Sequence, residues 1–380
     1  MTSLLGRPRG PGLIRQANLA VLFIVFILVG IGIATLYSVE GGSFRPWAER
    51  HGLRFLVGTA LVLVMLAVPL GTWLRLANPI YAIALVLVIL VPFTGTEALG
   101  ARRWLSVGGW SFQPTDLMKV ALVLALARYY QWLPPDRVSD PRWVLAPLLM
   151  IAVPVVLTLR QPDLGSATLF ATVGLALMFV AGVSLIYFIG GILVLGLAAP
   201  LIWSSLHDYQ RRRVEIFLDP DSDPLGAGYH INQSKIALGA GGVSGKGFMQ
   251  GTQSQLDFLP EKHTDFIFTM YAEEWGFIGG MLLLGLYTLL LVLLGRMAIR
   301  AESPFTRLLI AGAWVTIFLY VFINIAMVTG LVPVVGVPLP FVSYGGTSML
   351  TLTAGLGLAL AADARGPWDR LRPGEPGPLF

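Results

Sequence analysis

Four ionisable side chains lie within five positions of one another, namely Glu261, Lys262, His263 and Asp265. They belong to the stretch GTQSQLDFLPEKHTDFIFTMYAEEWG (251–276), in which a polar loop ends and a long apolar run begins. At such a boundary both desolvation and neighbouring charge act on ionisable groups, and active sites use the same two effects. We therefore take Asp265 as the candidate catalytic residue and the other three as candidate substrate-binding residues.

Asp265 has two interpretations. It follows Thr264, a good N-cap residue type, so it can be a carboxylate that complements the start of a helix. Alternatively, it is a general base at the outer face of a membrane. The helix dipole favours the ionised carboxylate and weakens it as a base, whereas burial has the opposite effect. Glu261, Lys262 and His263 can be solvated loop charges, or Lys262 can neutralise a phosphate as a point charge.

The composition indicates what surrounds this stretch. Of the 380 residues, 56% are hydrophobic and only 12% are charged, whereas a soluble domain is about 25% charged. The sequence therefore predicts an integral membrane protein. The absence of cysteine excludes disulfides, zinc–thiolate sites and cysteine nucleophiles. The net charge of +5 suits anionic lipids and phosphates, and no basic stripe with interleaved aromatics indicates nucleic-acid binding.

The apolar runs predict the fold class. A membrane-spanning helix needs about 20 mostly apolar residues. We predict an all-α polytopic membrane protein that forms a single domain (1–380) with about ten transmembrane helices. The first run lacks a cleavage site and is expected to be a retained helix, not a signal peptide. The predicted helices span residues 16–38, 53–70, 76–93, 113–133, 142–159, 165–183, 185–204, 265–295, 306–330 and 347–363.

The Lys and Arg residues of the short loops predict the orientation. One side carries about twice as many as the other, so we place both termini in the cytoplasm. The long loop between helices 7 and 8 (205–264) is then extracytoplasmic. Its apolar residues predict that it folds back over the helix ends, with a short helix near 230–239. The Pro- and Gly-rich tail (366–380) is predicted to be mobile and cytoplasmic.

A shorter outer loop contains a second group of candidate residues. Arg102, Arg103 and Trp104 precede Asp116 and Lys119, and one helix face can pair the last two. This pair can be purely structural. In the functional interpretation, the five side chains line a groove for an anionic lipid head group.

Two outer turns contain further candidate substrate contacts. Gln161 and Asp163 lie in a short turn, where Asp163 can simply begin a helix. Ser343 and Tyr344 precede two glycines, and such a turn can offer backbone N–H groups to a pyrophosphate or be a plain connection.

Carboxylates also occur inside the eighth predicted helix. Glu273 and Glu274 lie two turns beyond Asp265, where burial in a membrane is costly, so they are expected to face a polar cavity or a partner. The small residues from Gly276 to Gly280 are expected to let helix backbones approach closely.

Three familiar motifs are incomplete. Gly245 and Lys246 resemble the end of a P-loop, but the first glycine and the Ser/Thr of that motif are missing. Asp219, Asp221 and Asp223 start like an EF-hand loop that is not completed, so only a loose divalent-cation site remains an alternative there. No grouping of Ser, His and Asp has the context of a hydrolase nucleophile.

Six long motifs follow one another along the chain, and they carry a resemblance. They read GARRWL (100–105), FQPTDLMK (112–119), RQPDLGSA (160–167), FLDPDSDPLGAGYHINQSKIALGAGGVSGKG (217–247), FLPEKHTDFIF (258–268) and LPFVSYGGTSM (339–349). Over nearly its whole length the sequence resembles the SEDS family, the shape, elongation, division and sporulation proteins that polymerise peptidoglycan. GTQSQL (251–256) is more similar to the elongation member than to the division member. Asp116 departs from the family pattern, which usually has Glu there.

The resemblance implies ten membrane helices in the cytoplasmic (inner) membrane and glycosyltransferase activity on lipid II, an undecaprenyl pyrophosphate-linked disaccharide pentapeptide. It also implies that Asp265 is essential and that the partner is a class B penicillin-binding protein, a PBP2-like transpeptidase. Our hypothesis is that Asp265 accepts the proton of the acceptor hydroxyl as general base. Arg102, Arg103, Lys119, Lys262 or a divalent cation such as Mg²⁺ would stabilise the departing pyrophosphate.

Two alternatives come from other classes of protein. One is a lipid II flippase, in which Glu273 and Glu274 would couple transport to protons. The other is a non-catalytic scaffold for the penicillin-binding protein. Most of the charge within the predicted helices lies near their outer ends, which favours chemistry at the outer face.

Overall fold

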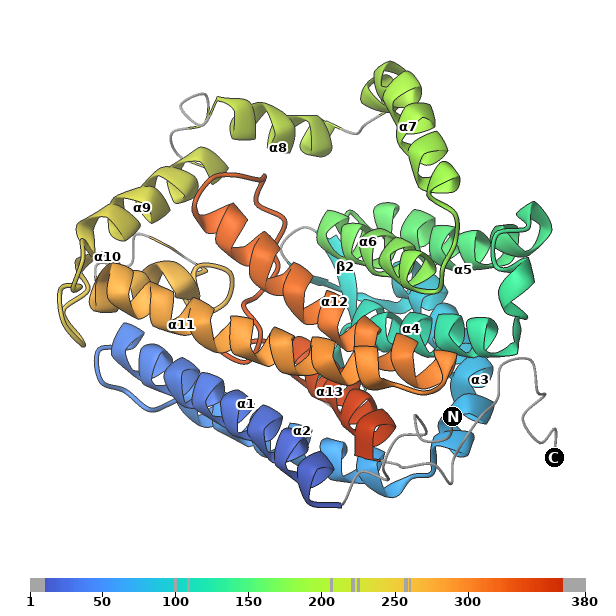
Figure 1. Cartoon of the computed structure of the whole chain (residues 1–380). Helices are drawn as coiled ribbons and strands as arrows, with labels where there is room; N and C mark the ends of the chain where they lie inside the picture. Colours follow the sequence, from blue (N-terminus) through green and yellow to red (C-terminus); the bar gives the residue numbers. More distant parts are fainter. Residues whose placement is uncertain are drawn as a thin grey trace.

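The computed structural model describes residues 11–98, 101–107, 110–205, 208–219, 223, 226–255, 259 and 261–364. This part of the chain is almost entirely helical (Figure 1). Its long helices are α1 (Pro11–Val39), α2 (Trp47–Ala67), α3 (Leu70–Thr94), α4 (Pro114–Trp132), α5 (Pro141–Leu159), α6 (Leu164–Val180), α7 (Leu185–Ser205), α11 (Ile267–Arg300), α12 (Pro304–Val328) and α13 (Thr347–Ala364). A short 3₁₀ turn (Pro135–Arg137) joins α4 to α5.

Each of the apolar runs singled out in the sequence lies in one of these long helices, which confirms the all-α fold class. Within the described residues, seven helices are long and apolar enough to cross a membrane, namely α1, α2, α3, α5, α11, α12 and α13. Of the other three, α6 and α7 have shorter apolar stretches, and α4 carries Asp116 and Lys119 in its first turns. That all ten cross the membrane stays a prediction.

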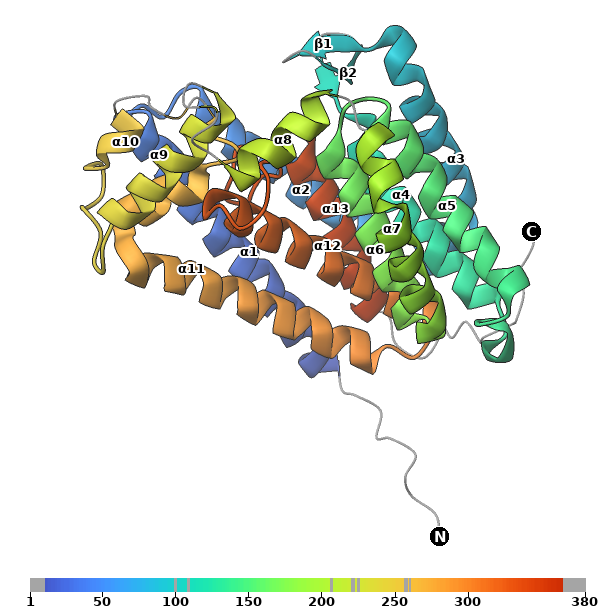
Figure 2. The ribbon, with the colours of Figure 1, turned by 90° about the horizontal axis from the view of Figure 1, so that it is seen from above.

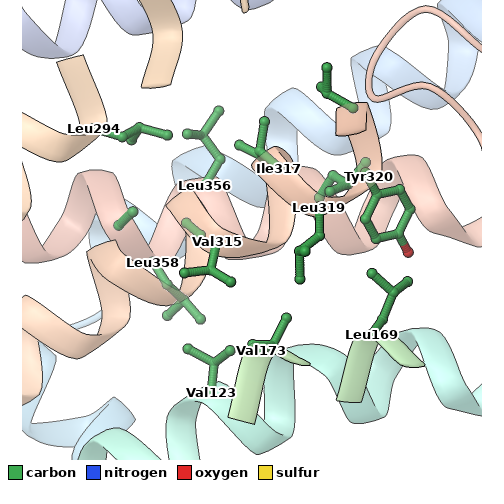
Figure 3. Packing of buried hydrophobic residues seen from close by; sticks show 14 of the residues in the cluster. Val123, Leu169, Val173, Leu294, Val315, Ile317, Leu319, Tyr320, Leu356 and Leu358 are labelled. Carbon is green, nitrogen blue, oxygen red and sulfur yellow. The ribbon is translucent and has the colours of Figure 1, made fainter. Parts of the chain in front are cut away.

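Helix α12 lies at the centre of the bundle and packs against α4, α6, α11 and α13 (Figures 1 and 3). Side chains such as Val123, Val173 and Val315 meet in this core (Figure 3). Helix association in a lipid environment depends on close packing, because lipid tails are as apolar as leucine. Gly312 illustrates this, since a Cβ there would lie 2.3 Å from Cγ1 of Val123. Glycine therefore lets α12 approach α4.

Helix α7 extends along the edge of the structure (Figures 1 and 2). Its apolar side chains are strongly exposed, for example Leu197 at 83% and Leu201 at 74%. A helix with this surface is suited to contact with lipid tails.

In its described residues, the loop between α7 and α11 contains three short helices, α8 (Asp208–Leu218), α9 (Ala227–Ala240) and α10 (Thr252–Gln255). The short helix predicted near 230–239 is thus confirmed as α9, whereas α8 was not predicted. Helix α9 packs on α11 and α12. The buried hydroxyl of Ser234 lies 2.7 Å from that of Thr269 on α11 and donates to the carbonyl of Val328 on α12 over 2.7 Å. This part of the loop therefore packs on α11 and α12, whereas the placement of the whole loop over the helix ends stays a prediction.

A small antiparallel sheet, which was not predicted, lies between α3 and α4. Its strands are β1 (Thr96–Ala98), β2 (Ala101–Val107) and β3 (Trp110–Phe112), in the order β1-β2-β3. In Figure 2 this sheet lies along the same side of the bundle as α8, α9 and α10. We call this side the loop end of the bundle. Strand β2 carries Arg102, Arg103 and Trp104 to it.

Helix α11 is interrupted at Gly276, whose φ of 66° lies in the left-handed region. The segment 241–247 fills the interruption: N–H groups of Phe277 and Gly247 donate to Gly242 (2.9 Å) and Glu274 (3.0 Å). Gly245 is the tightest point, because its φ is +79° and a Cβ there would lie 2.0 Å from the carbonyl oxygen of Glu274. Gly276 therefore breaks the helix to admit a loop, which differs from the helix–helix approach predicted for it.

We predict that Gly245→Ala destabilises the protein by about 2 kcal/mol or more, because a left-handed residue gains a Cβ against backbone. Thermal unfolding of the purified protein in detergent measures this change. Gly239→Ala is the matched control, since that glycine lies in α9 with nothing within 4 Å of its Cβ position. Equal melting temperatures for the two variants would contradict the close contact.

Candidate active site

Asp265 lies in a turn (261–266) directly before α11. The helix begins at Ile267, and its N-cap residue, Phe266, makes no side-chain cap. The helix therefore does not begin at Asp265 after an N-cap at Thr264, which was one of the two interpretations of the sequence. Instead, the Thr264 hydroxyl donates to the Glu261 carboxylate over 2.8 Å, and the Glu261 carbonyl accepts from the N–H groups of Thr264 and Phe266 at 3.2 Å each. Local bonds of this kind compete with helical ones.

Three consecutive carbonyl groups of this turn are held by the segment that contains α12 and the loop after it. The carbonyl of His263 accepts from the N–H of Tyr344 at 2.9 Å. The next carbonyl, that of Thr264, accepts from the hydroxyl of Ser343 at 2.6 Å. The third belongs to Asp265 and accepts from the side-chain amide of Asn324 at 2.8 Å. We call these three bonds the carbonyl clamp.

The clamp fixes the backbone of Asp265 and leaves the side chain partly exposed. Gly336 passes directly beside the carboxyl group: its φ is +73°, and a Cβ there would lie 3.4 Å from Oδ2 of Asp265. The hydroxyl of Ser343, a predicted substrate contact, also accepts from the N–H of Leu339 at 2.7 Å. Ser343 therefore holds the protein's own backbone at two points.

The neighbouring side chains of the turn connect it to the hairpin between α1 and α2. Lys262 is buried and donates to the carbonyl of Val39 over 3.2 Å. His263 is also buried, with Nε2 at 2.5 Å from a carboxylate oxygen of Glu40 and its ring stacked on Trp47 at 4.4 Å. No spacing pattern points to Glu40 or Trp47, because each lies more than 200 positions from His263 along the chain.

Tyr344 extends this cluster. Its ring meets Trp47 edge-on at 4.6 Å, and the guanidinium of Arg54 lies 4.2 Å above it, a cation–π arrangement. Trp104 of β2 lies beside Gly346, where a Cβ would be 3.7 Å from its ring. Arg102, on the same strand, is exposed.

Helix α9 brings a histidine close to the turn. The ring of His230 lies 6.4 Å from that of Phe266. Burial lowers the pKa of His230 below its usual value, opposed by the negative charges of Glu261 and Asp223. His230 is therefore neutral at pH 7 and can donate or accept a hydrogen bond near the turn 261–266. We call this turn, which contains Glu261 and Asp265, the acidic turn.

The predicted ion pair on α4 is confirmed. Lys119 Nζ lies 2.7 Å from Oδ1 of Asp116, and both side chains are buried. Lys119 also donates to the hydroxyl of Tyr320 over 2.8 Å, and the hydroxyl of Thr347 donates to Asp116. Such extra hydrogen bonds are required to offset the cost of burying two charges. A small, mostly apolar cavity of about 30 Å³ adjoins Lys119 between α4, α12 and α13.

The turn before α6 is arranged as the capping interpretation predicts. Asp163 is the N-cap of α6, accepting from the N–H of Ser166 at 3.1 Å and from the side chain of Gln113 at 2.9 Å. Gln161 is buried and donates to the carbonyl of Val88 over 2.7 Å. The guanidinium of Arg103 donates to the carbonyl of Pro162.

The segment from Gly336 to Thr347 connects these clusters. Its first part contacts Asp265, its middle part supplies Ser343 and Tyr344 to the clamp, and its end, at Thr347, bonds Asp116. The structure thus brings most of the predicted residues to the loop end of the bundle along one connecting segment.

Glu273 and Glu274 each have a protein partner. The carboxylate of Glu273 accepts from Lys246 (2.6 Å), from the N–H and hydroxyl of Thr252 (2.9 and 3.0 Å) and from the N–H of Gln253 (3.2 Å). Glu274 accepts from the hydroxyl of Ser38 on α1. These carboxylates therefore hold the long loop and α1 to α11.

Among the described residues, no group of three or more His, Cys, Asp or Glu side chains is arranged to hold a metal ion. Asp221, one of the three aspartates of the loose cation site considered from the sequence, lies outside the described residues. Of the other two, Asp223 lies 3.6 Å from the guanidinium of Arg212.

The long apolar helices, together with an acidic turn and a buried ion pair at one end of them, define a multi-pass membrane protein with its candidate site at the loop end of the bundle. The chain belongs to the FtsW/RodA/SpoVE family of cell cycle proteins, whose sequence profile matches residues 13–365. This confirms the resemblance to the SEDS family.

Named relatives share most of their length with this chain. It is 42% identical over 345 residues to the peptidoglycan glycosyltransferase MrdB of Escherichia coli (strain K12), covering 90% of this chain and 91% of MrdB. It is 35% identical over 368 residues to the probable peptidoglycan glycosyltransferase FtsW of Trichlorobacter lovleyi, covering 94% and 95%.

Two solved structures are also similar to this chain in both fold and sequence. A chain from a structure described as the coordination of polymerization and crosslinking by a peptidoglycan synthase complex is 33% identical, with a TM-score of 0.78 and coverage of 90% of this chain and 96% of that one. The rod shape determining protein RodA of Thermus thermophilus is 30% identical, with a TM-score of 0.67 and coverage of 90% and 95%.

We predict that Lys119→Met lowers the free energy of unfolding by about 3–5 kcal/mol, because it leaves the buried carboxylate of Asp116 without its counter-ion. The double variant Asp116→Leu/Lys119→Met should recover more than half of this loss, because no buried charge remains. Thermal unfolding of the two variants and the wild type measures the difference. A double variant as unstable as the single one would show that the charge is not the cause.

Proposed function

We propose that this protein is a peptidoglycan glycosyltransferase that polymerises lipid II into glycan strands for cell elongation and rod shape. The observation that carries the chemistry is the placement of Asp265. Its backbone carbonyl and the two before it are held by hydrogen bonds, and its side chain is partly exposed beside Gly336. The names of the relatives support the activity and the role in rod shape.

In this reaction Asp265 accepts the proton of the 4-hydroxyl of the acceptor GlcNAc. The hydroxyl oxygen attacks the anomeric carbon of the donor, and the bond from that carbon to the pyrophosphate oxygen breaks. Since an α-linked donor gives a β-linked product, one inverting displacement suffices and no covalent intermediate is needed. General base catalysis of this kind contributes about 10²–10⁴-fold.

The departing pyrophosphate requires positive charge or hydrogen-bond donors. Lys119 is already paired with Asp116, and Lys262 donates to the end of α1. Arg103 is better suited, because within the described residues its buried Nε has no hydrogen-bond partner. Arg102 is exposed on the same strand. We assign these two arginines to the leaving group, with Mg²⁺ as a further candidate for charge neutralisation.

The proposed substrate and partner together predict how the protein is oriented in the membrane and what it assembles with. Lipid II is delivered at the outer leaflet, so the loop end of the bundle faces outward from the cytoplasmic (inner) membrane and both termini are cytoplasmic. The partner is a class B penicillin-binding protein that cross-links the strands. A similar chain belongs to a peptidoglycan synthase complex, which supports such an assembly.

We predict that Asp265→Asn reduces polymerisation of lipid II by at least about 100-fold, because an amide cannot accept the proton. The assay uses purified protein in liposomes with its penicillin-binding partner, and glycan length is read on a gel. Asp136→Asn is the matched control, since Asp136 is exposed in the turn between α4 and α5.

Each result of this assay decides between the candidates. Polymer from a folded Asp265→Asn protein would remove Asp265 as the base. No polymer even from the wild type, with lipid II still exchanged between leaflets, would favour the flippase. The anchoring of Glu273 by Lys246 and by loop amides argues against that carboxylate as a proton carrier.

A further inference from the structure

Asn324 stands out among the buried polar side chains. It lies on α12 with 0% of its surface exposed, and no feature of the sequence marks it. Its amide nitrogen donates to two backbone carbonyls, those of Asp265 and Val337, each at 2.8 Å. Both hydrogens of the amide are therefore used.

The two carbonyls lie on either side of the candidate base. One belongs to Asp265 itself. The other belongs to Val337. Its neighbour Gly336 lies beside the carboxyl group, since a Cβ there would be 3.4 Å from Oδ2 of Asp265. Asn324 thus links the backbone that bears the carboxyl group to the backbone that passes in front of it.

The oxygen of the same amide is costly to the fold. Within the described residues, Oδ1 of Asn324 is buried and has no hydrogen-bond partner. Leaving such an acceptor unsatisfied costs about 1–3 kcal/mol. The amide cannot be turned round to relieve this, because its oxygen would then face two carbonyl oxygens. The two donors of the amide therefore explain an asparagine at this place, and its oxygen does not.

We infer that Asn324 is a positioning residue for glycosyl transfer: its two N–H donors hold Asp265 and the 336–337 backbone in one fixed arrangement, so that the carboxyl group meets the acceptor hydroxyl. This inference rests on the proposed function of Asp265. Asn324 does not touch the substrate, and its effect on the reaction passes through Asp265.

The test compares Asn324→Leu with Asn324→Ser in the polymerisation assay, with the partner present. Leucine fills the volume but has no donor, whereas serine leaves a small space but keeps a hydroxyl donor, and that space can admit a bridging water. We expect Asn324→Leu to lower kcat by about 100-fold, since small displacements of a catalytic group have effects of this size. Asn324→Ser, which has one donor in place of two, should lower kcat by about 10-fold and so keep about ten times more activity than Asn324→Leu. KM for lipid II should stay within about twofold for both, because the lost interaction acts on the chemical step.

A packing role predicts the reverse order, with leucine more active and more stable than serine. That order, or a change in KM alone, would overturn the inference. Gln131→Leu is the matched control: this buried amide on α4 accepts from the N–H of Phe305 at the start of α12, far along the helix from Asn324. It should lower the melting temperature and leave kcat unchanged.

The two proposals fail separately. If Asp265→Asn is inactive and both Asn324 variants keep wild-type kcat, only the positioning role is wrong. If Asp265→Asn is active, the base is wrong, whatever the Asn324 variants do. If Asn324→Leu does not fold, the ratio of Asn324→Ser to wild type decides, since kcat equal to that of the wild type would contradict the need for two donors.

Discussion

No water reaches the backbone inside an apolar helix bundle, so a buried polar group that finds no partner within the protein lowers its stability. This constraint is strictest where a helix starts or is broken. At the turn before α11 it is met by the carbonyl clamp. At the break around Gly276 it is met by the amides of segment 241–247. The two irregular stretches lie on either side of Glu273 and Glu274 in α11. The Glu273 carboxylate holds the long loop in place through Lys246 and Thr252.

The segment from Gly336 to Thr347 has a different task. Up to Gly346 it has no regular secondary structure, yet it contacts Asp265 at one end, and Thr347 at the start of α13 contacts Asp116 at the other. Two acidic groups far apart in the sequence are thereby held in one arrangement. A displacement of α13 or α4 would therefore also move the backbone beside Asp265, because the segment from Gly336 to Thr347 joins the two places.

The sequence was sufficient wherever the deciding contacts are local. The pair of Asp116 and Lys119 and the cap at Asp163 depend on residues three positions apart, and the apolar runs depend on composition alone. A cap at Thr264 is not formed, because the Glu261 carbonyl accepts the Phe266 N–H that such a cap would use. Partners such as Asn324 and Glu40 were missed, because they lie 59 and 223 positions from the residues they bond, and no spacing rule reaches so far.

The carbonyl clamp also has an order in time. All three of its donors, on Asn324, Ser343 and Tyr344, follow Asp265 in the chain. During synthesis, α11 and its acidic turn enter the membrane before any of these donors has been made. A nascent or truncated chain that ends before Tyr344 therefore carries the carboxyl group without the support that orients it. The clamp is therefore complete only once the chain has been made as far as Tyr344.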